Sequence, residues 1–226
     1  MIDIDRYMTQ LTQMLRQHFG SRLSYVGLQG SYLRGEATDS SDIDAMVVID
    51  RLDINDLDAY RAILAALPHT DKACGFICSN ADLANWNPLE IGHLLHSTKD
   101  LFGSLQTLIP AYTRQDICNF IKLSINNLYH GLCHTYIHAD AATMAATLPA
   151  LYKGVFFILQ NLYDLTHGAF ITSKNELLQK LDGLDRTVLT RSADLSKGIE
   201  YDLRDSVTLL FNWCQQTLAA VSSDNI

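Results

Sequence analysis

The chain has 226 residues, of which 48% are hydrophobic, and a formal net charge of −8 at pH 7. This length holds one domain or two modest ones, and this hydrophobic content is enough to bury a core. An acidic chain without runs of lysine or arginine is poorly suited to a long nucleic acid, which argues against a polymerase-like role.

The first half of the chain alternates between helix and strand patterns. An amphipathic helix is predicted over residues 6–19, ending at Gly20, because its apolar residues recur at helical spacing. Strands are predicted over residues 23–28, 42–49 and 72–78, with a helix over 55–67 that ends near Pro68. These elements predict a small mixed sheet with helices.

The second half changes to long helices. Two stripes of apolar residues at helical spacing mark two of them: Ile117, Ile121, Ile125, Leu128 and Leu132, and then Val207, Leu210, Phe211, Cys214, Leu218 and Val221. Residues 151–165 are densely apolar and are expected at the centre of a helical bundle, in a helix that Pro149 either begins or kinks. Ser173 and Glu176 predict a capping box for a further helix that Gly183 follows.

We therefore expect an α+β protein in two parts. Residues 1–110 would form the mixed-sheet domain and residues 111–226 an all-α helical bundle, with a boundary near Pro110. The chain has no evident internal repeat or low-complexity segment.

Gly30 and Ser31 follow the first predicted strand, and Asp42 and Asp44 open the second. Residues two apart on a strand project to the same face, so the two carboxylates would lie side by side. Unit charges about 4 Å apart repel by roughly 4 kcal/mol at an effective dielectric of 20, which favours a cation between them. Mg²⁺ takes one or two protein carboxylates together with substrate phosphates, and a helix starting near Ser31 would direct backbone N–H groups at a phosphate.

This order of residues resembles the signature of the nucleotidyltransferase superfamily, which includes DNA polymerase beta and kanamycin nucleotidyltransferase. The resemblance rests on Gly30-Ser31, on Arg34-Gly35-Glu36-Ala37 and on residues 39–44 followed by an apolar strand. A weaker resemblance to small bacterial nucleotidyltransferase-domain proteins extends over nearly the whole chain, through the helical segment 151–157.

The resemblance implies an enzyme that moves a nucleoside monophosphate, such as AMP from ATP, to a hydroxyl group of a small molecule. Asp42 and Asp44 would be the catalytic and metal-binding residues for one or two Mg²⁺ ions. Gly30, Ser31 and Arg34 would bind the nucleotide, although an exposed arginine with no role is an equal alternative for Arg34. A homodimer is possible by the same resemblance.

One position departs from the family pattern. Family members usually supply a third carboxylate from the strand after the Asp-x-Asp strand, but residues 72–78 carry no acid. Asp71, Asp82, Glu90 or an acid of the helical half could serve instead, and the sequence leaves this choice open. The alternative function is therefore a nucleotide-binding regulator or a protein-modifying, antitoxin-like protein with little or no turnover. A third hypothesis is a structural relative that binds no nucleotide.

His130, His134 and His138 recur every four residues on one predicted helix. Imidazoles at this spacing can bind zinc, but no glutamate occupies the H-E-x-x-H position, so a polar helix edge is the favoured interpretation.

The cysteines and the N-terminus indicate a reducing compartment. The five cysteines at positions 74, 78, 118, 133 and 214 include no C-x-x-C pair, so free thiols are expected. The N-terminal residues are acidic where a signal peptide needs a basic segment, and no apolar stretch approaches about twenty uncharged residues. We therefore expect a cytoplasmic protein without a membrane partner.

Overall fold

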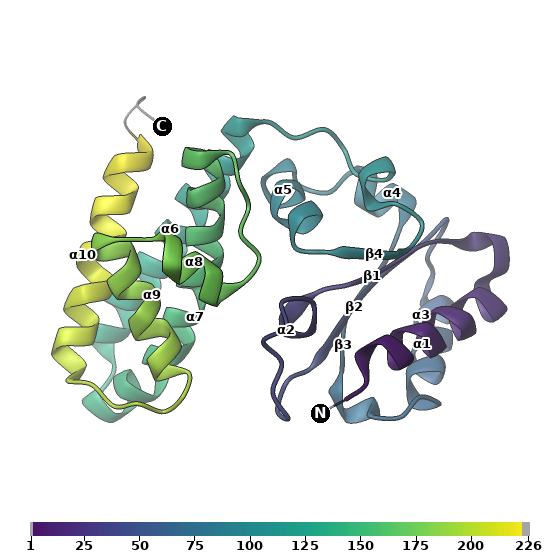
Figure 1. The fold of residues 1–226 in the computed structure, drawn as a ribbon, viewed down its shortest axis with the longest axis horizontal. Helices are drawn as coiled ribbons and strands as arrows, with labels where there is room; N and C mark the ends of the chain where they lie inside the picture. Colours follow the sequence, from purple (N-terminus) through teal and green to yellow (C-terminus); the bar gives the residue numbers. More distant parts are fainter. Residues whose placement is uncertain (1, 223–226) are drawn as a thin grey trace. The chain divides into compact units, whose positions relative to one another are not determined.

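The computed structural model describes residues 2–222, which fall into two compact units that divide between Tyr112 and Thr113 (Figure 1). The first unit holds a four-stranded sheet with helices, and the second is made of helices. The predicted α+β class, with a small mixed sheet followed by a helical bundle, is confirmed. The assignment of 1–110 and 111–226 as separate domains stays a prediction.

The sheet has the strand order β3-β2-β1-β4. β1 (Leu23–Leu28) pairs antiparallel with β2 (Ile43–Ile49) on one edge and with β4 (Lys99–Phe102) on the other. β3 (Ala73–Ser79) runs parallel to β2, and the crossover that a parallel pair needs contains α3 (Ile54–Ala65). The C-terminal end of β1 therefore lies beside the N-terminal end of β2, where the single-turn helix α2 (Gly30–Leu33) begins.

Each face of the sheet has its own apolar core. On one face, α1 (Ile4–Phe19) and α3 pack against alternate residues of β2, which are Ile43, Ala45, Val47 and Ile49. On the other face, Met46 and Val48 pack with side chains from α4 (Asn80–Ala84) and α5 (Pro88–His96). β2 is therefore buried on both faces, and only its N-terminal end is open enough for polar side chains.

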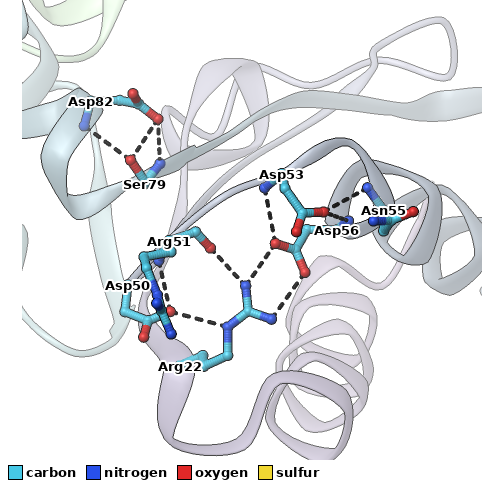
Figure 2. Close-up of polar contacts among 8 residues, drawn as sticks. All are labelled: Arg22, Asp50, Arg51, Asp53, Asn55, Asp56, Ser79 and Asp82. Atoms are coloured by element: carbon cyan, nitrogen blue, oxygen red, sulfur yellow. Dashed lines mark hydrogen bonds and ion pairs between the residues drawn. The ribbon is translucent and has the colours of Figure 1, made fainter.

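The Arg22 guanidinium ties the start of β1 to the segment that follows β2 (Figure 2). Its Nε donates to Asp50 Oδ1 at 3.1 Å, and its Nη2 donates to Asp56 Oδ2 at 2.6 Å and to the Arg51 carbonyl at 2.7 Å. Asp56 Oδ2 also accepts a hydrogen bond from Asp53 N at 3.0 Å, which closes the capping box of α3. The Arg22 hydrogen bonds lower the pKa of Asp56, which is buried.

The helical unit contains α6 (Arg114–His138), α7 (Ala141–His167), α8 (Lys174–Lys180), α9 (Gly183–Leu195) and α10 (Leu203–Ser222). The two predicted stripes supply its core from α6 and α10, while α7 contributes the largest buried share. Buried hydrogen bonds fix α7 to its neighbours, because Tyr152 donates to the Ser206 carbonyl at 2.7 Å and Ser192 donates to the Tyr152 carbonyl at 2.9 Å.

The structure specifies two details of the helical unit. α7 begins at Ala141, so Pro149 lies inside this helix and does not begin it; the helix starts earlier because Asp140 Oδ1 accepts a hydrogen bond from Thr143 N at 2.7 Å. The helix predicted from Ser173 is present as α8, with the Ser173 side chain accepting a hydrogen bond from Glu176 N, and Gly183, with φ +52°, follows it as the first residue of α9.

Of the helices within residues 2–222, α7 is the one that is long and apolar enough to cross a membrane by length and composition alone. A core helix passes the same test, and Tyr152, Phe156 and Leu159 of α7 are buried among the other helices. This helix is therefore weak evidence for a membrane span.

Candidate nucleotide-binding and metal-binding site

The Gly30-Ser31 turn is fixed to the sheet by the residue before it. Gln29 N donates to the Asp44 carbonyl at 2.9 Å, and Gln29 Nε2 donates to Thr98 Oγ1 at 2.7 Å, next to the start of β4. The helix expected near Ser31 is present as α2, but it has only four residues. A phosphate at this turn would therefore be bound by backbone N–H groups, and the dipole of so short a helix adds little.

Gly30 lies directly against the carboxylate of Asp44. Gly30 has φ +70°, a conformation that other residues rarely adopt, and a Cβ built on it would lie 1.8 Å from Asp44 Oδ2. The glycine is therefore required both for its backbone conformation and for space. This contact brings one of the predicted metal-binding carboxylates to the predicted phosphate-binding turn.

Asp42 and Asp44 lie at the N-terminal end of β2. Asp42 is exposed and precedes the first residue of the strand, whereas Asp44 is half-buried within it. Side chains alternate between the two faces of a strand, so both aspartates lie on the face opposite to the buried residues Ile43, Ala45, Val47 and Ile49. The structure therefore places Gly30, Ser31 and the two aspartates at one end of the sheet.

Arg34 is already paired with an acid. Its Nε donates to Glu36 Oε2 at 3.1 Å, and the two side chains are 19% and 18% exposed. Burial, together with the nearby charges of Arg34 and His96, lowers the pKa of His93, on α5, to about 4. No motif or spacing in the sequence predicted that this histidine would lie close to Arg34.

No acid occupies the β3 position beside the Asp-x-Asp pair. In the parallel register of β2 and β3, Asp44 pairs with Cys74. Cys74 is an exposed free thiol at the edge of the sheet. The place where the family pattern leads us to expect a third carboxylate is therefore taken by a cysteine.

The three acids considered as substitutes occupy different surroundings. Asp71 precedes β3 and is exposed, at the same end of the sheet as Asp42. Asp82 follows the opposite end of β3, which is about 16 Å from Cys74 at 3.3 Å per residue. Glu90 accepts a hydrogen bond from Trp86 Nε1 at 2.6 Å.

Asp82 has a structural role that the sequence could have revealed. Its Oδ2 accepts hydrogen bonds from Ser79 Oγ at 2.7 Å and from Ser79 N at 2.9 Å, which form the capping box of α4 (Figure 2). These bonds lower the pKa of Asp82. The Ser-x-x-Asp pattern at Ser79 is the signal for this cap.

The donor chemistry of Asp42 and Asp44 fits a magnesium ion. Both supply hard carboxylate oxygens, and the missing side chain of Gly30 gives the Asp44 carboxylate room to lie against the turn. In the stretch from residue 2 to residue 222, no group of three or more His, Cys, Asp or Glu side chains is arranged to hold a metal. A metal here would therefore take its other ligands from a phosphate and water.

The predicted histidine row is present on α6 as an exposed edge. The rings of His130 and His134 are 6.1 Å apart between centroids, and those of His134 and His138 are 4.8 Å apart. They form no metal-binding group with any other residue that the structure describes.

One family model matches the part of the chain that holds the candidate site. Residues 9–70 match the family model described as "Nucleotidyltransferase domain". The matched segment contains β1, the Gly30-Ser31 turn, β2 and α3, so the candidate site lies within it. The match confirms, for this segment, the resemblance to the nucleotidyltransferase superfamily found in the sequence, and it supports a transferase activity.

A solved structure shares the fold over nearly the whole chain. It is the spectinomycin adenyltransferase of Enterococcus faecialis, crystallised with ATP and spectinomycin. The match has a TM-score of 0.58 at 14% sequence identity and covers 95% of this chain and 99% of that chain. At this identity the likeness establishes the fold alone. None of the curated proteins matches the chain.

Proposed function

We propose that this protein transfers a nucleoside monophosphate, AMP from ATP, to a hydroxyl group of a small molecule in a magnesium-dependent reaction. The observation that carries the proposal is the contact between the Asp44 carboxylate and Gly30, at the start of the turn that holds Ser31. The nucleotidyltransferase domain over residues 9–70 supports it, as does the shared fold with an adenyltransferase crystallised with ATP and spectinomycin.

Each site residue has a distinct task in this proposal. Ser31 and the neighbouring backbone N–H groups bind the terminal phosphates of ATP, and Asp42 and Asp44 hold Mg²⁺. Mg²⁺ bound there would neutralise phosphate charge and align the attacking and leaving oxygens. Arg34 binds the phosphates less strongly than an unpaired arginine would, because its ion pair with Glu36 partly neutralises its charge.

The chemistry is an exchange of one phosphorus–oxygen bond for another. The acceptor oxygen forms a bond to the α-phosphorus of ATP while the bond to the β-phosphate breaks, and pyrophosphate leaves. The hydroxyl proton passes to solvent or to a base. The side chains of this site act by positioning the triphosphate and by balancing its charge.

Calorimetric titration with ATP, with and without Mg²⁺, tests the binding step. The wild-type protein should bind ATP only when Mg²⁺ is present, and Asp42→Asn and Asp44→Asn should each weaken binding by about tenfold or more, because each removes a carboxylate from the metal. Asp58→Asn is the matched control, since Asp58 is an exposed acid of α3 that pairs only with Arg61. A wild-type protein that binds no ATP in the presence of Mg²⁺ would sink the proposal.

A second candidate function is a nucleotide-binding regulator or an antitoxin-like protein with little turnover. The observation in its favour is Cys74, which stands beside Asp44 where active relatives would place an acid. Pyrophosphate release across a panel of hydroxylated acceptors separates the two. Release with any acceptor supports the transferase, whereas tight ATP binding without release supports the regulator.

We also propose a cytoplasmic location. All five cysteines are free thiols, as expected in a reducing compartment. A homodimer stays a prediction of the family resemblance, which the molar mass from light scattering would test.

A further inference from the structure

The three histidines of α6 lie outside the candidate site, and they are not evenly spaced. His130, His134 and His138 are all exposed, and each is about one helical turn from the next. The ring centroids of His134 and His138 are 4.8 Å apart, whereas those of His130 and His134 are 6.1 Å apart. His134 and His138 are therefore the closer pair, at the C-terminal end of the helix.

The spacing of this pair matches that of two imidazoles that share one metal ion. A ring nitrogen about 2.0–2.1 Å from Zn²⁺ places the centroid of its imidazole ring about 3.2 Å from the ion. Two such rings at an angle of about 90–110° around the ion have centroids about 4.5–5.2 Å apart. The 4.8 Å separation of His134 and His138 lies within this range, and the 6.1 Å separation of His130 and His134 lies outside it.

The same pair lines a hollow where α6 ends and α7 begins. The hollow has a volume of about 550 Å³, and its lining includes His134, His138 and Asp140. No lysine or arginine is among the described residues that line it. Hydrogen bonds from Thr143 lower the pKa of Asp140, so this carboxylate is charged at neutral pH. A cation in the hollow therefore meets a negative charge and no lysine or arginine that would compete with it.

The two imidazoles are the ligands that the protein can supply here. Within residues 2–222, no group of three or more His, Cys, Asp or Glu side chains is arranged to hold a metal, so Asp140 is not a third ligand. Cys133 precedes His134, but it lies close enough to the buried Cys214 of α10 to raise the pKa of that thiol, and it does not line the hollow. Water can fill the other two positions of the tetrahedral shell that Zn²⁺ prefers.

We propose that His134 and His138 together bind one divalent transition-metal ion, such as Zn²⁺, with water in the remaining coordination positions. Imidazole nitrogens suit Zn²⁺, Cu²⁺ and Ni²⁺, whereas Mg²⁺ prefers carboxylate oxygens, phosphate oxygens and water. This pair and the carboxylates of Asp42 and Asp44 therefore select different metal ions. The pair contains none of the residues proposed to bind ATP or Mg²⁺, so it lies beyond the proposed function.

Calorimetric titration of the full chain with zinc chloride tests the proposal. The titration is made in millimolar Mg²⁺, which occupies sites made of oxygen ligands, and in a Cys74→Ser background, which removes an exposed thiol. The Cys74→Ser protein should bind Zn²⁺, and His134→Gln and His138→Gln should each weaken this binding by at least about tenfold, because the remaining imidazole loses its chelating partner. Glutamine is a good helix former, so both exposed positions should stay helical, as judged by circular dichroism.

Two control variants isolate the pair from the rest of the molecule. His130→Gln makes the same change on the same edge of α6 and should leave the affinity for Zn²⁺ within about twofold, because the 6.1 Å spacing of its ring from that of His134 is too wide for a shared ion. The double variant Asp42→Asn/Asp44→Asn should bind Zn²⁺ as the Cys74→Ser protein does, even if it no longer binds ATP. Failure of this proposal is thereby distinguished from failure of the proposed function.

Three results would overturn the proposal. The first is no binding of Zn²⁺ by the Cys74→Ser protein at concentrations up to millimolar. The second is Zn²⁺ binding that survives unchanged in the double variant His134→Gln/His138→Gln, which would show that the ion is bound elsewhere. The third is a loss of affinity in His130→Gln as large as that in His138→Gln, which would show that the closer pair is not the site.

Discussion

Replacing Gly30 by alanine tests the central contact of the candidate site. Two effects act on this variant. The backbone at φ +70° costs an alanine about 1–2 kcal/mol. In addition, the new Cβ would lie 1.8 Å from Asp44 Oδ2, so the carboxylate has to retreat to at least 3.0 Å.

Gly35 offers a matched control for the backbone effect alone. It has φ +68°, and a Cβ built on it meets nothing within 4 Å. Gly35→Ala should therefore lose about 1–2 kcal/mol of unfolding free energy, measured by urea denaturation, and Gly30→Ala should lose at least as much. Only Gly30→Ala should also lose magnesium-dependent ATP binding, by about tenfold or more, and any transferase rate by about 100-fold, because a carboxylate is misplaced by more than about 1 Å.

Either of two results would contradict this role of Gly30 and Asp44. In the first, Gly30→Ala binds ATP with Mg²⁺ as tightly as the wild type, so the Asp44 carboxylate is not a ligand at this position. In the second, Gly35→Ala loses as much ATP affinity as Gly30→Ala, so backbone strain and not the displaced carboxylate accounts for the loss.

Arg22→Gln should lower the urea midpoint clearly more than Arg61→Gln, because Arg22 pairs with buried Asp56 whereas Arg61 is 81% exposed in its ion pair; equal midpoints would contradict this. Since the folded-state pKa values of Asp56 and Asp82 are lowered, the stability they confer is present at neutral pH and is lost as the pH falls below about 5; urea unfolding of Asp82→Asn should show a shallower loss from pH 6 to pH 3. Cys74→Glu should strengthen magnesium-dependent ATP binding severalfold by adding an oxygen ligand, measured by calorimetry, whereas Cys74→Ser should not; no gain with glutamate would place this position outside the metal site.

The strands could be predicted where short apolar segments lie between turn residues. β1, β2 and β3 lie close to their predicted positions because each is a short, largely apolar segment, and β2 is also rich in Val and Ile. β4 was not predicted, because this edge strand has four residues and two of them, Lys99 and Asp100, are charged. A strand so short and polar is recognised only through its pairing with β1.

α5 was also not predicted, and a tertiary contact explains why. Gly92 interrupts its helical pattern. A Cβ at this position would lie 2.9 Å from the ring of Tyr112, so packing requires the glycine that weakens the local signal. His96 Nε2 and Tyr112 Oη are 3.1 Å apart in the same contact.

The part of the candidate site that is formed by residues close together in the chain could be predicted from the sequence. The proximity of Gly30 and Asp44 follows from the strand–turn–strand pattern, and the structure places them together. The ion pair of Arg34 with Glu36 joins near neighbours, but it depends on the conformations of the two side chains. The register that sets Cys74 beside Asp44 depends on a crossover of many residues, which no local pattern encodes.

The position of β2 inside the sheet has a consequence for motion. The strand that carries Asp44 is hydrogen-bonded along both edges, whereas the turn at Gly30 and Ser31 is followed by a single turn of helix. Amide hydrogen exchange should therefore be slow in β2 and fast in α2. When a nucleotide binds, the protection of amides from exchange should increase at the turn and stay unchanged in β2. The phosphates would then be bound between a rigid strand and a turn that becomes ordered on binding.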